Sequence, residues 1–159
     1  MTALIRPARP EECEAVAGMV RTLARDTGAE TVPAVTGETL RAEAFGASPL
    51  LRLWVAEADG RLVGMLVGVV AFSTWRGGRG LYVCDLYAEP ARRGSGLGRR
   101  LLAAAARAAR DEGLSYMKLE IIGTNQGVAR FYARLGFEPV EGDVTWVLER
   151  DGLDRLAAG

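Results

Sequence analysis

The stretch from Asp85 to Arg100 constrains this chain more than any other part of the sequence. It predicts a strand that stops at Pro90, a loop rich in arginine and glycine, and a helix after the loop. Gly94, Gly96 and Gly98 leave alternate loop residues without a side chain, so backbone N–H groups can surround an anion. The helix directs its positive dipole end and its unpaired N–H groups toward the same point. The stretch therefore predicts a binding site for a phosphate-bearing ligand.

Two common phosphate loops do not fit this stretch. A P-loop ends in Gly-Lys-Ser/Thr, whereas Leu97-Gly98-Arg99 offers no hydroxyl group for magnesium. A dinucleotide-binding fingerprint needs a third glycine at the position where Arg99 stands. The positive charge comes from Arg92, Arg93, Arg99 and Arg100. We therefore expect backbone N–H groups and arginines, without a metal, to hold the ligand.

The pattern around this stretch predicts a single α/β domain over residues 1–159. Strand 81–87, helix 97–112 and strand 116–122 form a right-handed crossover, so the two strands are expected to be parallel. Tight turns at 58–61 and 75–80 require antiparallel neighbours. The remaining expected elements are strands at 4–8, 52–57, 62–73, 137–140 and 144–150, and helices at 10–28, 38–45 and 126–135. Together they predict a mixed, mostly antiparallel sheet with helices on both faces.

The composition excludes several classes of protein and of site. The net charge is zero, which argues against a general nucleic-acid-binding surface. The longest apolar run, 62–72, is too short to cross a membrane, and the N-terminal segment lacks the apolar core of a signal peptide. Two cysteines far apart suit a reducing cytoplasm, where we expect this protein.

The sequence contains no histidine, which excludes a Ser-His-Asp triad, a Cys-His pair and a histidine-ligated zinc site. Acid–base chemistry must therefore rest on Asp, Glu, Tyr, Cys, Lys or water.

Two signatures resemble a known enzyme family. Arg93 to Gly98 reads Arg-x-x-Gly-x-Gly and resembles the coenzyme A pyrophosphate loop of the GCN5-related N-acetyltransferases (GNAT). Asn125 to Phe137 resembles the Asn-x-x-x-Ala-x-x-Phe-Tyr-x-x-x-Gly-Phe segment of the same family. The two occur in the family's order, joined by a helix and a strand, and the resemblance covers nearly the whole chain. It implies the GNAT fold, in which one parallel strand pair splays apart, and acetyl-CoA as cosubstrate.

The resemblance also implies which residues bind acetyl-CoA. The end of the strand, at Leu86, Tyr87 and Ala88, would pair with the pantetheine amides, and an N–H group there, such as that of Leu86, would face the thioester oxygen. Asn125 would tie the pantetheine arm or the splayed strands, and Tyr132 would give a proton to the departing thiolate. The residues expected at the pyrophosphate are Arg93, Gly94, Ser95, Gly96, Leu97, Gly98 and Arg99.

The segment 72–87 is similar to the diamine, thialysine and spermidine/spermine acetyltransferases, and implies that Asp26, Cys84 and Asp85 form the acceptor site. Cys84 stands where this subgroup commonly has Glu, and Asp26-Thr27 stands where the human-type polyamine enzyme has Tyr-Glu. The loss of two carboxylates argues against a polycationic acceptor. The resemblance of 146–157 to the C-terminal segment of the subgroup implies a homodimer.

The general base is open between Asp85, Glu120 and a chain of water molecules. Cys84 could in principle carry the acetyl group as a covalent intermediate.

The sequence therefore predicts an acetyl-CoA-dependent N-acetyltransferase with Tyr132 and Asp85 as catalytic residues. Its acceptor would be the primary amine of a small molecule, an amino-acid-like amine or a diamine, which attacks directly through a tetrahedral intermediate. The alternatives are a protein N-terminal or lysine acetyltransferase and a coenzyme A-binding regulatory domain without turnover.

Overall fold

The computed structural model describes residues 2–121, 126–140, 148 and 150–157, with side chains of 150 and 153 excepted. The chain forms two compact units, Met1–Glu120 and Ile121–Gly159, and each is described by itself. The first unit contains β1 (Leu4–Pro7), η1 (Pro10–Glu12), α1 (Cys13–Asp26), α2 (Gly37–Phe45), β2 (Leu51–Ala58), β3 (Arg61–Ser73), β4 (Gly78–Ala88), η2 (Pro90–Arg92), α3 (Leu97–Asp111) and β5 (Tyr116–Leu119). The second contains α4 (Gln126–Arg134) and α5 (Arg150–Ala157). No described helix is long and apolar enough to cross a membrane.

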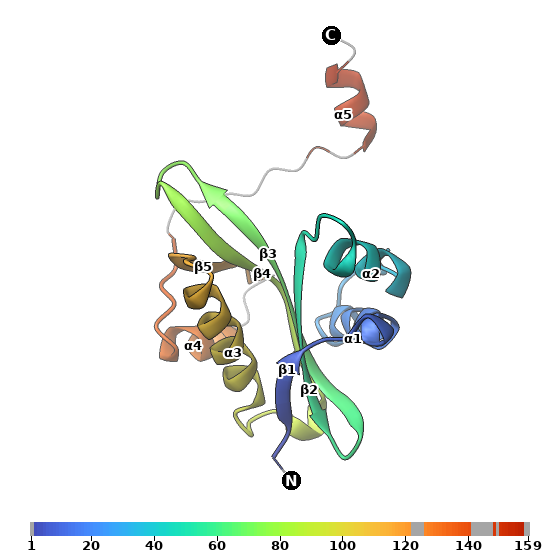
Figure 1. The fold of residues 1–159 in the computed structure, drawn as a ribbon, viewed down its shortest axis with the longest axis vertical. Coiled ribbons are helices and arrows are strands. Elements are labelled where there is room, and N and C mark those ends of the chain that lie inside the picture. The colour runs from blue at the N-terminus through green and yellow to red at the C-terminus, as the bar shows by residue number, and fades with distance from the viewer. Residues whose placement is uncertain (1, 122–125, 141–147, 149, 158–159) are drawn as a thin grey trace. The chain divides into compact units, whose positions relative to one another are not determined.

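The five strands form one sheet in the order β1-β2-β3-β4-β5 (Figure 1). The first three strand pairs are antiparallel, and β4 with β5 is parallel. The β4–β5 pairing runs from Gly80 opposite Tyr116 to Val83 opposite Leu119, whereas β4 itself continues to Ala88. The predicted mixed sheet with one parallel pair is confirmed, and the parallel pair covers only the first part of β4.

Helices cover both faces of this sheet (Figure 1). On one face, alternate residues of β2 and β3 such as Val55 and Met65 pack with Val16 of α1 and Leu40 of α2 in a buried apolar cluster. On the other face α3 buries its apolar stripe, which consists of Leu97, Leu101, Leu102, Ala105 and Ala109. A Cβ atom added to Gly64 of β3 would lie 3.3 Å from the side chains of Leu97 and Leu101. Helix α3 is therefore packed directly onto the strand, and the predicted helices on both faces are confirmed.

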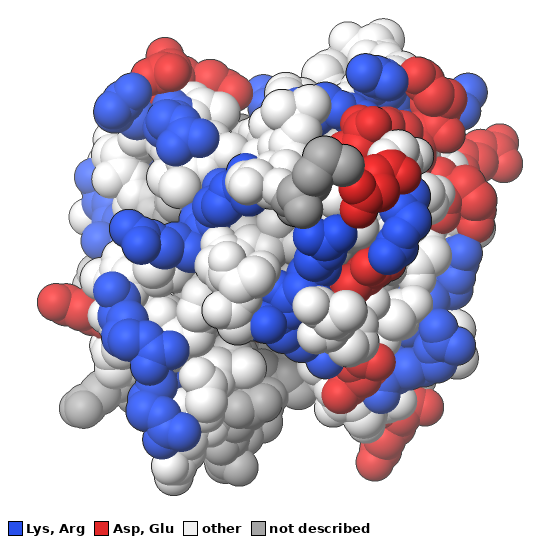
Figure 2. Space-filling view, turned by 90° about the horizontal axis from the view of Figure 1, so that it is seen from below, with Lys and Arg blue, Asp and Glu red and all other residues white. Residues whose placement is uncertain are grey.

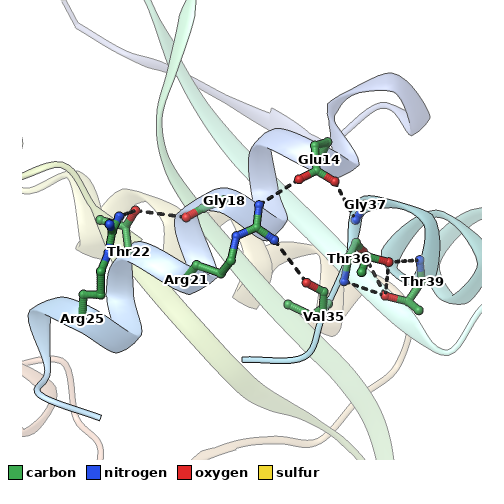
Figure 3. Close-up of polar contacts among 9 residues, drawn as sticks. All are labelled: Glu14, Gly18, Arg21, Thr22, Arg25, Val35, Thr36, Gly37 and Thr39. Atoms are coloured by element: carbon green, nitrogen blue, oxygen red, sulfur yellow. Dashed lines mark hydrogen bonds and ion pairs between the residues drawn. The ribbon is translucent and has the colours of Figure 1, made fainter. Parts of the chain in front are cut away.

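The first turn of α1 holds the start of α2 (Figure 3). The carboxylate of Glu14 accepts a hydrogen bond of 2.9 Å from the N–H of Gly37 and another of 2.8 Å from Arg21. Arg21 also donates to the carbonyl of Val35. The hydroxyl of Thr36 accepts from the N–H of Thr39 and caps α2. These contacts fix the connection between the two helices by hydrogen bonds.

Three sequence-based boundaries differ from the structure. Residues 137–140 form no strand, because Pro139 lacks an N–H group and no described segment pairs with them. Strand β5 stops at Leu119 rather than Ile122. Most of the expected strand at 144–150 lies outside the described residues, but Arg150 begins α5, whose first turn carries Asp151 where a helix favours an acidic residue. The expectation of one domain over 1–159 stays a prediction.

One guanidinium group ties three elements of the first unit together. Arg6 of β1 donates to both carboxylate oxygens of Glu12, at 2.6 and 2.9 Å, and to Glu57 of β2 at 2.6 Å. The side chains of Arg6 and Glu12 are only 16% and 15% exposed. The hydrogen bond from Arg6 is the main reason that the pKa of Glu12 lies below its ordinary value.

This network makes the free energy of unfolding depend on pH. Because the pKa of Glu12 is lower in the folded protein, its contribution is present above about pH 4.5 and is lost as the pH falls through the folded pKa. We expect Arg6→Gln to lower the free energy of unfolding at pH 7 by about 1–3 kcal/mol and to flatten its decline as the pH falls below about 4.5. Urea unfolding at each pH measures both effects. Arg110→Gln, which removes an exposed pair with Asp111, is the control, and an equal effect of the two variants would contradict the prediction.

Candidate active site

Strand β4 contains a β-bulge at the centre of the predicted site. Val67 of β3 lies opposite Asp85 and the next residue, Gly68, lies opposite Val83, so Cys84 is an extra residue without a partner. Because residues directly opposite share a face, Asp85 lies on the face of Val67, which packs in the cluster with α1. Tyr82, opposite Val69, lies on the same face. The bulge therefore brings Tyr82 and Asp85 to one side of the sheet.

Burial makes the carboxylate of Asp85 more basic than that of an ordinary aspartate. Its side chain makes no hydrogen bond or ion pair with any described residue, and burial raises the pKa of its carboxyl above the ordinary value. Glu120 is the other carboxylate considered from the sequence. Burial and then the charge of Glu120 raise the pKa of Tyr82, so the phenol stays protonated at neutral pH. Asp85 is thus the carboxylate that directly follows the bulged residue and has a pKa raised by burial.

Cys84 lies at an exposed position of the bulge, yet its thiol is a poor nucleophile. Loss of water around the sulfur and, second, the neighbouring Asp85 carboxylate raise the pKa of the thiol to about 11. A thiol attacks as its thiolate, and this environment disfavours the thiolate at neutral pH. The local electrostatics thus oppose the covalent route through Cys84 that the sequence left open.

The loop between β4 and α3 has the conformation expected for an anion site. Gly94 and Gly96 have φ angles of +77° and +82°, in the left-handed region that favours glycine. A Cβ atom at either residue would meet nothing within 4 Å, so the space beside the loop is open. The hydroxyl of Ser95 donates to the carbonyl of Arg92 at 2.6 Å and closes the turn. The first N–H groups of α3, which have no partner within the helix, begin directly after Gly96.

Most of the loop's arginines contact protein groups. Arg92 pairs with Asp59 at 3.3 Å, and Arg100 donates to the carbonyl of Ala3. Arg93 donates to the carbonyl of Ala88 at 3.0 Å and forms an ion pair with Asp26. Figure 2 shows Lys and Arg side chains spread across the surface seen from below, with many of the Asp and Glu side chains lying among them on the right of the view. The arginines of the loop are a local concentration of positive charge in a chain of zero net charge.

The last residues of β4 have one edge without a strand partner among the described residues. Leu86, Tyr87 and Ala88 pair with β3 on one side, whereas the described part of β5 pairs only as far as Val83 on the other. Backbone groups on that side are available to an extended ligand, apart from the Ala88 carbonyl that Arg93 occupies. An extended ligand next to the glycine loop can thus form backbone hydrogen bonds with the end of β4, as an added strand would.

Tyr132 belongs to α4 in the second unit. Its ring packs edge-on against Phe131 and Phe137, at centroid distances of 5.0 and 5.5 Å. Burial raises the pKa of its phenol, so the hydroxyl carries a proton at neutral pH. Asn125, also predicted in the site, lies outside the described residues.

Sequence reasoning missed Tyr82. Regular alternation along β4 would place Tyr82 and Asp85 on opposite faces, and only the bulge unites them. No glycine or proline at 82–85 signals this bulge, and the one sequence signal is Gly68 on the partner strand, opposite Val83 at the register shift.

Comparison with known proteins identifies the family. The family model described as "Acetyltransferase (GNAT) family" matches residues 14–137. The chain is 32% identical to thialysine N-epsilon-acetyltransferase of Sus scrofa, over 85% of this chain and 84% of that protein. The Mus musculus enzyme of the same name is also 32% identical, over 96% of both chains. Streptothricin acetyltransferase of Streptomyces lavendulae is 30% identical, over 83% of this chain and 79% of that protein.

Solved structures share the fold at low sequence identity. An integron cassette protein from the mobile metagenome of V. cholerae superposes with a TM-score of 0.80 and 19% identity, over 100% of this chain and 99% of that one. An aminoglycoside acetyltransferase from an uncultured soil metagenomic sample gives a TM-score of 0.77 and 15% identity, over 93% and 97%. The predicted family and fold are confirmed: the chain belongs to the acetyltransferase (GNAT) family and is an N-acetyltransferase.

Proposed function

We propose that this enzyme transfers the acetyl group of acetyl-CoA to the primary amine of a small molecule. The observation that carries the proposal is the arrangement at the end of β4. Asp85, whose pKa is raised by burial, precedes a strand end with a free edge, and that strand end leads into the open glycine loop. The family implies acetyl-CoA as the acetyl donor. One segment thus offers a base near the reacting thioester, a strand edge for an extended arm and a loop for a pyrophosphate. This combination suits acetyl-CoA.

The loop and the strand end would bind different parts of acetyl-CoA. N–H groups of Gly94, Gly96 and the first turn of α3, with Ser95, Leu97, Gly98 and Arg99, surround the pyrophosphate. Leu86 to Ala88 pair with the pantetheine amides. We assign Asn125 to the pantetheine arm or to the splayed strands, as the family resemblance implies.

Asp85 and Tyr132 would move the two protons of the reaction. Asp85 accepts a proton from the acceptor's ammonium group, because its raised pKa makes it a stronger base than an ordinary aspartate. The neutral nitrogen then attacks the carbonyl carbon and an N–C bond forms, while the N–H of Leu86 stabilises the negative oxygen. As the C–S bond breaks, the phenol of Tyr132 gives its proton to the departing sulfur, and the surplus proton of the nitrogen passes through solvent to the resulting phenolate.

The acceptor we propose is an amino-acid-like amine or a diamine. Thialysine and streptothricin are named in the titles of relatives at 30–32% identity. Cys84 contributes no charge beside Asp85, and a polyamine would leave most of its charges without a counter-charge on leaving water. An amino-acid-like amine brings its own carboxylate. We also propose a cytoplasmic homodimer, as the subgroup resemblance implies; light scattering would test the dimer.

We expect amino-acid-like amines to have a higher kcat/KM than spermine. Cys84→Glu adds one negative charge and should shift the ratio of the two kcat/KM values toward spermine by about tenfold. Thiol release from acetyl-CoA, followed over a panel of amines, measures both variants. Cys84→Gln matches the size of glutamate without its charge and should keep the original preference.

The same panel separates the rival functions. A purified protein whose best substrate is spermine would contradict our interpretation of Cys84. Preferential acetylation of peptide N-termini or lysine side chains would indicate a protein acetyltransferase. Coenzyme A binding without acetylation of any amine would indicate a regulatory domain.

A further inference from the structure

The guanidinium group of Arg93 contacts three groups of the protein itself. Its Nε donates to the carbonyl of Ala88 at 3.0 Å, and its Nη2 forms an ion pair with the carboxylate of Asp26. The guanidinium carbon also lies 5.8 Å from the centroid of the Tyr87 ring, within reach of a cation–π contact. These contacts hold Arg93 to the end of β4 and the end of α1.

We propose that Arg93 and Asp26 form a positioning pair that holds the glycine loop ready for coenzyme A, and that Asp26 does not bind the acceptor amine. This inference rests on the proposed function, because it assigns roles within the same site. It departs from the sequence-based expectation that placed Arg93 at the pyrophosphate and Asp26 in the acceptor site.

The pair connects the three segments that meet at the loop. Asp26 is the last residue of α1, Ala88 is the last residue of β4, and Arg93 immediately precedes Gly94. Arginine suits this position because its planar group presents several N–H donors in fixed directions. Tyr87, beneath the guanidinium, is 5% exposed and packs in the buried cluster with α1, so the anchor has a rigid base.

Beyond the Ser95–Arg92 hydrogen bond that closes the turn and the ion pair of Arg92 with Asp59, the glycines of the loop add no side-chain contact that could fix it. Gly94 and Gly96 have no side chains, and a Cβ at either would meet no atom within 4 Å. A loop of this kind loses conformational entropy when it closes around a ligand. An anchor at its first residue limits that loss before the ligand arrives, and such pre-organisation strengthens binding. Loss of the anchor should therefore weaken coenzyme A binding without removing any direct contact to the ligand.

The ion pair also changes what Asp26 can do for an acceptor. Its charge is balanced by Arg93, and its side chain is 29% exposed. An ammonium group at this carboxylate would compete with Arg93 for its charge, and displacing Arg93 would release the loop. Asp85, whose carboxylate makes no hydrogen bond or ion pair with any described residue, remains the carboxylate that we place in the acceptor site.

Calorimetry with coenzyme A and steady-state kinetics with both substrates test the proposal. We expect Asp26→Asn to raise the Kd for coenzyme A about threefold and Arg93→Ala to raise it about tenfold, since Arg93→Ala also removes the bond to Ala88. The double variant should match Arg93→Ala alone, because both changes remove the same interaction. The KM for acetyl-CoA should rise in each variant, while the KM for the amine and kcat stay unchanged.

Asp59→Asn is the matched control, because it removes a carboxylate that pairs with the neighbouring Arg92, and asparagine tolerates the φ of 52° at that position. It should leave the Kd for coenzyme A within about twofold of the original. Thermal unfolding confirms that each variant is folded, and Arg93→Lys replaces Arg93→Ala if that variant is not.

Two results would overturn the proposal. One is an Asp26→Asn variant with a raised KM for the amine and an unchanged Kd for coenzyme A, which would return Asp26 to the acceptor site. The other is an unchanged Kd in both single variants. The proposed function fails separately: if no amine is acetylated but Asp26→Asn still weakens coenzyme A binding, the positioning pair stands and the acetyl transfer does not.

Discussion

Gly96→Val is expected to abolish measurable coenzyme A binding, with a rise in Kd of at least about 100-fold. Gly96 has a φ of +82° and forms the N-cap of α3. A β-branched side chain disfavours this left-handed conformation, so the loop would have to change its path. The valine would also project into the open space where we place the pyrophosphate. Both effects remove the cradle of N–H groups, and calorimetry measures the loss.

The control for this variant distinguishes the effect of backbone strain on stability from the effect of losing the coenzyme A site on binding. Gly113, after α3, has a φ of +75° and open space around it, like Gly96. Gly113→Val should destabilise the fold through similar strain yet leave coenzyme A binding intact. Arg92→Ala should weaken binding only modestly. Unchanged affinity in a folded Gly96→Val protein would disprove the assignment of the loop.

Tyr132→Phe is expected to lower kcat by about ten- to a thousandfold while leaving the affinity for acetyl-CoA unchanged. The raised pKa of Tyr132 keeps its phenol protonated, so it can supply a proton to the departing thiolate. Phenylalanine keeps the edge-on contacts with Phe131 and Phe137 and removes only the hydroxyl. Steady-state kinetics under conditions where chemistry limits the rate measure the effect.

Tyr116→Phe makes the same chemical change on β5, where the ring lies beneath the guanidinium of Arg76, and should leave kcat unchanged. Equal kcat for Tyr132→Phe and the original protein would remove Tyr132 from the mechanism. An equal fall in both variants would point to a general effect of losing a phenol.

The segments that the sequence predicted well are those whose structure depends on nearby residues. Strand β4, its end before Pro90, the glycine turn at 94–96 and the start of α3 follow from local backbone preferences. The parallel pairing of β4 with β5 follows from the connecting helix, because a crossover of that length joins parallel strands.

The features that the sequence did not predict depend on contacts between distant residues. Asp26 and Arg93 are separated by 67 positions, and their ion pair exists only because α1 ends beside the loop. The segment 137–140 has residues of strand type, but a strand forms only with a partner, and no described segment provides one. The bulge at Cys84 depends on how β4 pairs with β3 and has no local signal.

Because of that bulge, the residue at position 84 does not take part in the pairing of β4 with β3. All residues of β4 except Cys84 lie opposite a partner on β3. Its side chain meets no requirement of strand pairing and lies exposed beside Asp85. Mutations at position 84 can therefore change the charge next to Asp85, where we place the acceptor, without changing the pairing of β4 with β3. In directed evolution or natural divergence of this sheet, we expect a change of amine selectivity at this position to cost little stability.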